Sequence, residues 1–421
     1  MKHYDKLEGI ELNGMPYFDE EYWVSPINYE PEVRNKYPKE MLIYDVTLRD
    51  GEQTPGVCWN EDERVRIAQA FEEIGIKRIE VGMPAVSDTI GKAVKRLRAQ
   101  NTKLDLVTLN RAKNEDLDLS EEIGITSVIV EHTVNPYLCK YGLDLTVEKL
   151  IDRLVTSIIY AKEKKMNVNF FGWDSFRCSI PYLKKIFGTV VKEAKPDSIT
   201  LTDTFGVALP AAVKYTVEQV RSVVGDTPIQ FHGHNEFGVG TAAALAAIEG
   251  GATCVHGAIN GLGERTGNTP TEELAMALEL LLGVKTGVDI SRIYDTCHLV
   301  SEIAKMPIEA KKPITGSLLG FVESGLVTEI SYRLRNVGIK TGMAPFTQEL
   351  VGAKPQQYAI GKGSGRTNIL YYLEKNGIDP ATVSKEQMGD IIDMVKTESR
   401  VRKALLSEKD LLVIVNKVLG R

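Results

Sequence analysis

The sequence predicts an α/β fold, a (β/α)8 barrel of the TIM-barrel type, followed by a smaller and mainly helical C-terminal region. From residue 41 onward, short β-branched or apolar runs alternate with amphipathic segments. Eight such units across residues 41–285 match the roughly 250 residues that a barrel of this kind takes. A doubly wound open sheet is the competing architecture. Polar residues at the ends of the apolar runs favour the barrel, because its active sites lie on that face.

The elements follow one another in a regular order. The first helical segment places Val65, Ile67, Ala68 and Phe71 at roughly helical spacing. The predicted strands are 41–47, 77–82, 103–109, 126–131, 167–171, 197–201, 229–232 and 253–259. The predicted helices are 61–71, 87–98, 146–165, 179–194, 210–223, 239–250 and 271–283. Glycines at 75, 124 and 251 stand where a helix must turn back toward the next strand.

Two further regions flank the predicted barrel. Residues 1–40 form an N-terminal arm rich in tyrosine, proline and acids, which either packs on another surface, such as a partner subunit, or is a disordered tail. Residues 286–421 form a post-barrel helical or lid region. It is expected to hold a helix at 290–310, an irregular glycine-rich stretch from Thr315 to Gly365, and helices at 378–396 and 398–419.

The composition excludes several classes of protein. A net charge of −6 argues against a nucleic-acid-binding protein, whose footprint is basic and clustered. The N-terminus has no apolar core of a signal peptide, and no run reaches the length of a membrane span. The five cysteines are scattered without C-x-x-C spacing, which fits reduced thiols in a cytoplasmic protein.

Two of the six histidines, His232 and His234, stand two residues apart at the end of a predicted strand. Residues two apart on a strand project to the same face. Two imidazoles so placed can bind one divalent metal ion, although partly buried histidines satisfied by the backbone would give the same pattern. Asp50 ends the first strand, so one carboxylate and two imidazoles leave open positions for a chelating substrate.

Arg49 precedes this aspartate and is placed to neutralise an oxyanion that develops on a carbonyl. The alternative for Arg49 and Asp50 is a simple surface ion pair. The segment Asn260–Asn268 follows the last strand, and its glycines allow a close approach of the backbone to a ligand.

Five motifs in this order resemble the DRE-TIM metallolyases, and most closely their Claisen-condensing branch of isopropylmalate, citramalate, homocitrate and Re-type citrate synthases. The motifs are D-x-T-L-R-D-G-E-Q-T-P-G, E-V-G-x-P, D-T-x-G, H-G-H-N and N-G-x-G-E-R-x-G-N. The resemblance is strong over 41–285 and looser afterwards, through Glu349–Gly352 and Gly361–Arg366. A loop cysteine of the related lyases is absent, which disfavours a lyase.

The resemblance implies a set of site residues. Asp50, His232 and His234 would hold a divalent metal, Mn²⁺, Mg²⁺ or Co²⁺. Asn268 would belong to the shell around it. Arg49 and Gln53 would contact the substrate, and Thr204 would help to hold the carboxylate of an oxo acid.

The chain departs from the family's pattern at three positions. Trp173 stands where the synthases carry a glutamate after strand 5. Val322 replaces a histidine thought to act in proton transfer, and Met343 replaces a nearby tyrosine. Enolising an acetyl thioester needs a base within hydrogen-bond reach. The nearest substitutes along the chain are Glu323, taken as the candidate catalytic base, and Asp174.

The resemblance implies an acyltransferase that condenses acetyl-CoA with a 2-oxo acid and releases CoA. A non-catalytic barrel that binds an oxo acid or CoA is the alternative of another class. A biotin-dependent carboxyltransferase ranks below both, since no A-M-K-M motif is present.

The substrate is expected to be oxaloacetate or 2-oxoglutarate, as in Re-citrate or homocitrate synthase, with isopropylmalate or citramalate synthase as the alternative. Only about 70 residues follow Leu350, few for a separate regulatory domain. A dicarboxylic substrate needs a second polar pocket, which Arg111, His132 and Arg177 at strand ends would supply unless they pair with neighbouring acids. A homodimer is expected, because the aromatic arm is unsuited to solvent.

Overall fold

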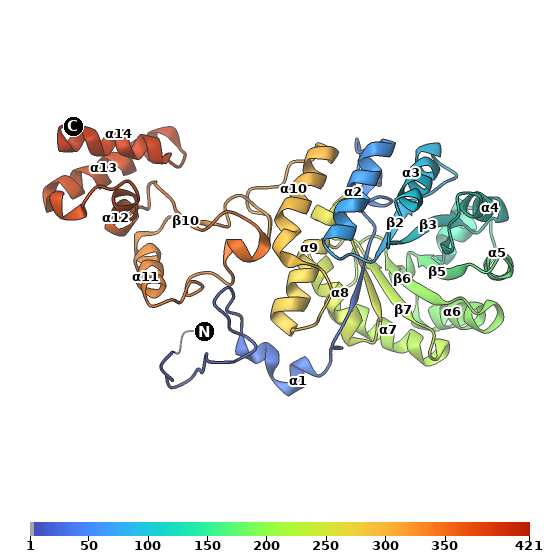
Figure 1. Cartoon of the computed structure of the whole chain (residues 1–421). Coiled ribbons are helices and arrows are strands. Elements are labelled where there is room, and N and C mark those ends of the chain that lie inside the picture. Colours follow the sequence, from blue (N-terminus) through green and yellow to red (C-terminus); the bar gives the residue numbers. More distant parts are fainter. Residues whose placement is uncertain (1–3) are drawn as a thin grey trace. The chain divides into compact units, whose positions relative to one another are not determined.

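The computed structural model describes residues 4–421 and divides the chain into two compact units (Figure 1). One unit comprises residues 30–308 and contains the barrel. The other combines the N-terminal segment through Tyr29 with residues 309–421. The domain boundaries at residues 40 and 285 remain predictions, and each unit is described below by itself.

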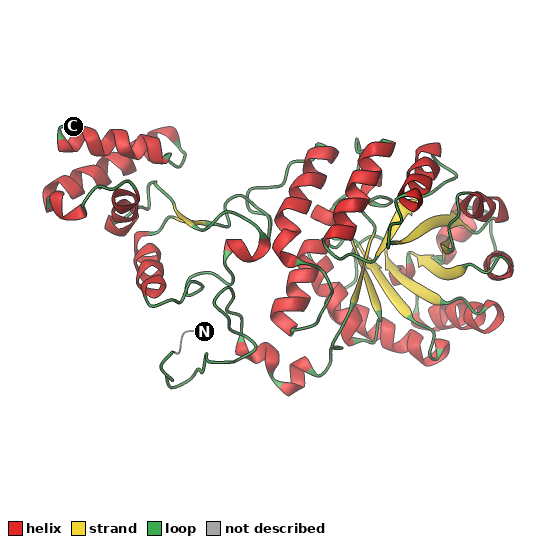
Figure 2. Ribbon diagram, in the orientation of Figure 1, coloured by secondary structure: helices red, strands yellow, loops and turns green. Residues whose placement is uncertain are grey.

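The larger unit is a closed barrel of eight parallel strands in sequence order, surrounded by helices (Figure 2). Strands β1 and β8 close it, with Leu42 opposite Cys254 and Asp45 opposite Gly257. The strands are β1 (Leu42–Asp45), β2 (Arg78–Gly82), β3 (Asp105–Arg111), β4 (Ser127–Thr133), β5 (Asn167–Trp173), β6 (Ser198–Asp203), β7 (Ile229–Gly233) and β8 (Cys254–Gly257). The predicted fold class is therefore confirmed, and each strand lies within two residues of its predicted position.

Helices connect consecutive strands and cover the outside of the barrel (Figure 2). Asn60 caps the first of them in a reciprocal capping box with Glu63. They are α2 (Glu61–Glu73), α3 (Asp88–Ala99), α4 (Asn114–Glu122), α5 (Val147–Glu163), α6 (Ile180–Ala194), α7 (Pro210–Val224), α8 (Gly240–Glu249) and α9 (Thr271–Met276). A further helix, α10 (Ile293–Ala304), contacts α2 and so belongs to the barrel unit.

Helix α4 was not predicted, because its sequence NEDLDLSEE is short and acidic and offers only two leucines as a periodic signal.

The barrel interior is a packed core rather than a channel. Side chains alternate between the two faces of a strand, so those two residues apart point to the same side. Tyr44, Ile129 and Phe171 are among the buried residues of one inner cluster, which also includes Val107, Leu109 and Cys254. This cluster lies beneath the carboxyl ends of the strands and supports the residues placed there.

The second unit is mainly helical. Two short strands, β9 (Phe321–Val322) and β10 (Gln357–Tyr358), pair in parallel. The hydrophobic core of the unit includes Ile369, Leu373, Ile391 and Leu411. The helices are α11 (Gly325–Asn336), α12 (Arg366–Lys375), α13 (Lys385–Arg402) and α14 (Glu408–Leu419). Helix α11 lies inside the stretch predicted to be irregular, and helix α13 continues past the predicted break at 396–398 to Lys403, which is left-handed.

The N-terminal segment packs within the second unit. Phe18 makes edge contacts with Tyr4 and Trp23. The backbone of Trp23 donates a hydrogen bond to Pro345, and Thr347 donates one to Glu21. Two short turns, Pro26–Tyr29 and α1 (Pro31–Arg34), then lead toward β1.

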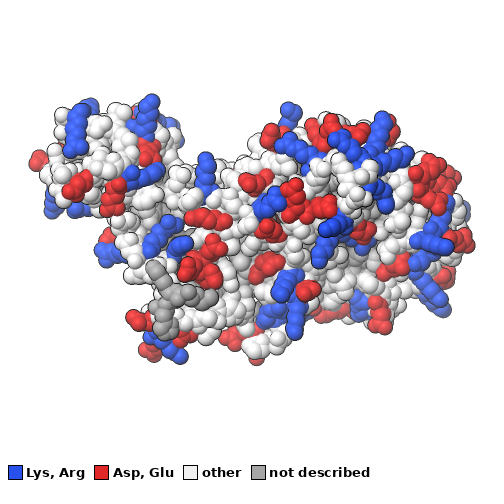
Figure 3. All heavy atoms as spheres, in the orientation of Figure 1, with Lys and Arg blue, Asp and Glu red and all other residues white. Residues whose placement is uncertain are grey.

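Acidic and basic side chains intermingle over both units on the face shown in Figure 3. Among residues 4–421, no helix is both long enough and apolar enough to cross a membrane.

Gly75 ends α2 in a position that excludes a side chain. Its φ is +86°, and a Cβ there would lie 2.2 Å from the carbonyl oxygen of Gly287. Gly124 follows α4 with a similar φ of +81°, but a Cβ there would make only ordinary contacts, at 3.5 Å or more, with the Arg98 side chain. The two glycines separate the cost of the backbone conformation from the cost of the clash.

We expect Gly75→Ala to lower the melting temperature far more than Gly124→Ala. Left-handed backbone costs each alanine about 1–2 kcal/mol, and only Gly75→Ala adds a collision with a backbone carbonyl. A change of 1 kcal/mol shifts the midpoint by roughly 2–4 °C in a domain of this size. Thermal denaturation followed by circular dichroism measures both variants, and equal midpoints would contradict the close packing at Gly75.

Candidate metal centre

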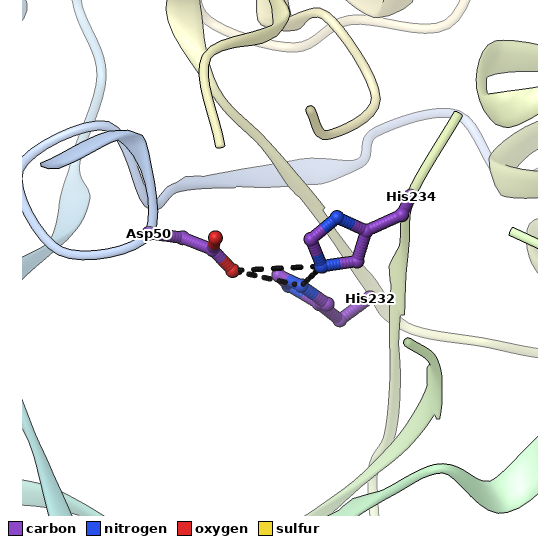
Figure 4. A group of neighbouring side chains, drawn as sticks. All are labelled: Asp50, His232 and His234. Carbon is purple, nitrogen blue, oxygen red and sulfur yellow. Dashed lines mark hydrogen bonds and ion pairs between the residues drawn. The ribbon is translucent and has the colours of Figure 1, made fainter. Parts of the chain in front are cut away.

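Asp50, His232 and His234 converge at the carboxyl ends of β1 and β7 (Figure 4). Asp50 lies in the tight turn after β1, where its N–H donates to the carbonyl of Val46. The Nε2 atoms of the two histidines lie 3.3 Å apart, and those of His232 and His234 lie 3.2 and 3.8 Å from Asp50 Oδ2. One potential ligand atom from each residue falls within 4.8 Å of the others. The structure thus brings together all three residues predicted to bind a metal.

The electrostatics of this cluster suit a divalent cation. The three side chains are buried, and burial lowers the pKa of His234 to about 3. His234 is therefore neutral, the form in which imidazole binds a metal. Burial would raise the pKa of Asp50, but Arg49 and the two histidines outweigh it and hold this pKa well below its ordinary value. Among the described residues, Asp50 Oδ1 and Asn268 Oδ1 are buried oxygens without a hydrogen-bond donor, as expected where a cation binds.

Arg49 is held in place by acids on two strands. Its Nε and Nη2 donate to the two carboxylate oxygens of Glu80 at 2.6 and 3.2 Å. Its Nη1 donates to Asp50 Oδ2 at 3.0 Å and to Gln53 Oε1 at 3.3 Å. Arg49 is 9% exposed and Asp50 is 2% exposed. The alternative of a simple surface ion pair is therefore wrong.

Thr204 lies at the end of β6, on another part of the same face. Its hydroxyl oxygen accepts a hydrogen bond from the Asp174 backbone N–H at 2.8 Å. Its carbonyl accepts one from Arg265, whose guanidinium also pairs with Glu236. These contacts fix Thr204 and leave its hydroxyl proton available to a ligand.

Asn268 stands beside His234, with which it forms an isolated antiparallel bridge. Its Nδ2 donates to the carbonyl of Leu262 at 2.8 Å, so the amide orientation is fixed. The Gly-rich loop packs against it closely, because a Cβ on Gly263 would lie 2.3 Å from Asn268 Nδ2. The glycine at 263 is thus required by the asparagine, in a conformation with φ +154°.

A cavity of about 340 Å³ opens at the ends of β3, β4 and β5. Two residues predicted to bind substrate, Arg111 and His132, line it together. Arg111 is paired with Asp116 through two hydrogen bonds of 2.8 Å, as the alternative reading anticipated. His132 Nδ1 lies 2.9 Å from the carbonyl of Thr133, and its Nε2 lies 3.5 Å from Arg153 Nη1.

Arg177, the third residue considered for this pocket, pairs with Asp174 at 2.6–2.7 Å and lies 3.9 Å from the ring centre of Phe205.

Glu131 also lines this cavity and received no role in the sequence analysis. It lies in β4, two residues after the inward-facing Ile129 and two before the strand ends at Thr133, so its side chain points toward the barrel axis. Burial raises the pKa of Glu131 to about 7, with Arg49 opposing the rise and Glu80 and Asp50 adding to it. Its position among the polar residues at strand ends was the only signal for it in the sequence.

Glu323 belongs to the other compact unit. It lies between β9 and α11, and its Oε1 accepts a hydrogen bond from the Gly363 N–H at 2.9 Å. The predicted motif residues Gly361–Arg366 therefore lie beside it. Val322, at the position of the missing histidine, pairs with Tyr358, and Met343 is 37% exposed. The role of Glu323 as a base stays a prediction.

Comparison with solved structures agrees with the observed fold. The 3-hydroxy-3-methylglutaryl-CoA (HMG-CoA) lyase of Bacillus subtilis superposes with a TM-score of 0.59, over 65% of this chain and 97% of that chain, at 20% sequence identity. The HMG-CoA lyase of Pseudomonas aeruginosa gives the same TM-score at 19% identity, over 65% of this chain and 96% of that chain. Both likenesses concern the fold.

Curated relatives match most of the chain. Homocitrate synthase AksA of Methanothermobacter thermautotrophicus is 32% identical, over 95% of this chain and 98% of its own length. A probable 2-isopropylmalate synthase of Ignicoccus hospitalis is 34% identical, over 94% and 96%. A putative (R)-citramalate synthase CimA of Archaeoglobus fulgidus is 32% identical, over 90% and 76%.

These relatives are synthases, which confirms the resemblance to the Claisen-condensing branch. The family model described as HMGL-like matches residues 40–300, a span that holds the whole barrel and the Asp50, His232 and His234 cluster. The chain therefore belongs to the HMGL-like family of DRE-TIM enzymes.

Proposed function

We propose that this protein is a metal-dependent acyltransferase that condenses acetyl-CoA with a 2-oxo acid and releases CoA. The observation that carries the proposal is the convergence of one carboxylate and two imidazoles beside a buried guanidinium at the barrel mouth. The synthase relatives, similar over at least 90% of this chain, support the same reaction class.

Each residue of the site has a distinct task in this proposal. Asp50, His232 and His234 would hold Mn²⁺, Mg²⁺ or Co²⁺, and such an ion acts as a Lewis acid toward a bound ketone. Arg49, fixed by Glu80 and Asp50, is preorganised to stabilise negative charge on the keto oxygen. Because that guanidinium is already oriented, little reorganisation is needed during the reaction.

Three further side chains would complete the substrate site. Gln53 accepts from Arg49 through its carbonyl oxygen, which turns its amide N–H groups toward other partners. Thr204 would donate its hydroxyl proton to the carboxylate of the oxo acid. Asn268, fixed through Leu262, would keep its carbonyl oxygen in the shell around the metal.

A dicarboxylic oxo acid suits the cavity at β3–β5. Lys113 and Arg153 line it together with Arg111, so three basic side chains reach the space. We therefore propose 2-oxoglutarate or oxaloacetate as the electrophile, giving homocitrate or citrate, and the homocitrate synthase relatives favour 2-oxoglutarate. Isopropylmalate and citramalate formation are the alternatives that other relatives support.

A non-catalytic barrel that binds an oxo acid or CoA is the second candidate function. The observation in its favour is the replacement of the family's glutamate, histidine and tyrosine by Trp173, Val322 and Met343. Thiol release from acetyl-CoA in the presence of a 2-oxo acid separates it from the synthase.

We expect His232→Ala to weaken Mn²⁺ binding by more than the roughly 10–100-fold that loss of an outer partner costs a metal site. The variant removes one of the three ligand atoms, while the strand that carries it remains. Isothermal titration calorimetry on chelator-treated protein measures the affinity. His298→Ala, an exposed histidine of α10, is the matched control. Undiminished affinity in His232→Ala would refute the metal site.

We expect the protein with Mn²⁺ and acetyl-CoA to release free thiol with only one or a few 2-oxo acids of a panel. The ketone is the electrophile, so omission of the oxo acid or addition of a chelator stops the release. The panel contains 2-oxoglutarate, oxaloacetate, 2-oxoisovalerate and pyruvate, followed by thiol titration and mass spectrometry of the product. Binding of an oxo acid without thiol release from any of them would favour the non-catalytic alternative.

We propose a homodimer. The barrel unit leaves large apolar side chains exposed in loops at the carboxyl ends of its strands, among them Tyr137, Tyr141 and Phe237 at 73–74%. Such residues mark interaction surfaces when they gather on one face.

The chain's five cysteines are all free thiols, which supports a reducing cytoplasm as its place of action.

We expect light scattering at micromolar concentration to give twice the mass of one chain, and Phe237→Glu to shift it toward one chain. A charge at the centre of an apolar interface is costly to bury. Val413→Glu, on exposed Val413 of α14, is the control and is expected to keep the wild-type mass. A wild-type monomer would contradict the dimer.

A further inference from the structure

The family's glutamate after strand 5 is replaced by Trp173, and the neighbouring strand carries a carboxylate close by. Strands β4 and β5 pair with Thr133 opposite Trp173 and Glu131 opposite Phe171. Adjacent strands lie about 4.8 Å apart. Glu131 therefore lies on the strand next to that of Trp173, two residues before the position opposite it. Both side chains line the same cavity.

Glu131 differs from the other acids at this face of the barrel in having no partner. Glu80 is bound to Arg49, Asp174 to Arg177, and Asp203 to the backbone N–H groups of residues 207 and 208. Within residues 4–421, the Glu131 carboxylate makes no hydrogen bond and no ion pair. Its oxygens are therefore free to accept a proton from a ligand in the cavity.

The surroundings keep this carboxylate reactive near neutral pH. Burial raises the pKa of Glu131 to about 7, and among the other causes Arg49 lowers it while Glu80 and Asp50 raise it. A general base works best when its pKa lies near the working pH. Glu131 also lies in the electrostatic field of the Asp50 cluster, since Arg49 lowers its pKa and Asp50 raises it.

We propose that Glu131 is the catalytic carboxylate that removes a proton from the methyl group of the acetyl thioester. This inference rests on the proposed function and names the base that the family pattern lacks here. One methyl C–H bond breaks, and its proton moves to a carboxylate oxygen of Glu131. The electron pair left on carbon forms the new bond to the keto carbon.

The remaining steps return the enzyme to its first state. The π electrons of the ketone move to its oxygen, beside the Arg49 guanidinium, and this alkoxide takes the proton back from Glu131. Water then attacks the thioester carbonyl, the C–S bond breaks, and the products are a carboxylate, the CoA thiol and one proton released to solvent. Glu131 ends the cycle ionised.

Proton removal can be measured separately from condensation. Acetyl-CoA deuterated at its methyl group is mixed with Mn²⁺, enzyme and the 2-hydroxy acid that corresponds to the active oxo acid. The hydroxy acid fills the site but offers no ketone to attack. Mass spectrometry then follows the loss of deuterium to water, and thiol titration follows full turnover with the oxo acid.

We expect Glu131→Gln to slow both deuterium loss and kcat by roughly 10²–10⁴-fold, as for a lost general base, with Mn²⁺ affinity unchanged. Glu131→Asp keeps the charge, and its rates of deuterium loss and turnover are expected to lie between those of the wild type and Glu131→Gln. Glu122→Gln, an exposed glutamate at the end of α4, is the matched control and retains wild-type rates. The double variant Glu131→Gln, Trp173→Glu is expected to lose deuterium faster than Glu131→Gln alone, since it restores a carboxylate at the family position.

The outcomes separate this inference from the proposed function. A wild-type protein that turns over, with wild-type deuterium loss in Glu131→Gln, would overturn the role of Glu131 alone. Loss of exchange in Glu323→Gln together with its retention in Glu131→Gln would transfer the role to Glu323. A wild-type protein that releases no thiol with any oxo acid would overturn the synthase proposal itself.

Discussion

The buried guanidinium of Arg49 is the interaction on which the rest of the barrel mouth depends. It lies among Glu80, Asp50 and Gln53, and it donates hydrogen bonds to all three. Burial raises the pKa of Glu80, and Arg49 acts against that rise. A guanidinium stays charged at any relevant pH and binds carboxylates with two parallel hydrogen bonds. Arg49 thus lowers the pKa of both buried carboxyl groups, Asp50 and Glu80, which would otherwise repel each other.

The same ion pair links the strand framework to the chemistry. Glu80 comes from β2, while Arg49 and Asp50 follow β1, so the contact joins neighbouring strands at their carboxyl ends. His232 belongs to β7, where it lies opposite Thr202 of β6. His234 directly follows β7 and lies two residues after His232, and both imidazoles lie close to Asp50 Oδ2.

The barrel and the convergence of Asp50, His232 and His234 could be predicted because each rests on a periodic or dense local signal. Alternating apolar runs fix strands to within two residues, and H-x-H fixes two ligands on one face. Helices α4 and α11 could not be predicted, because α4 offers little apolar periodicity and α11 begins in a glycine-rich stretch. The burial of Arg49 could not be predicted either, because it depends on a contact with Glu80, which lies 31 residues away in the chain.

Glu131 shows a different limit of sequence reasoning. At the aligned position, Trp173 replaces the glutamate of the family, which suggests that a catalytic carboxylate is missing. In the folded barrel the relevant neighbours are set by strand register, and the residues opposite each other on β4 and β5 are about one strand spacing apart. The carboxylate of Glu131 and the indole of Trp173, on neighbouring strands, line the same cavity. Whether a departure removes a function therefore depends on which side chains reach the cavity, and that is a property of the closed sheet.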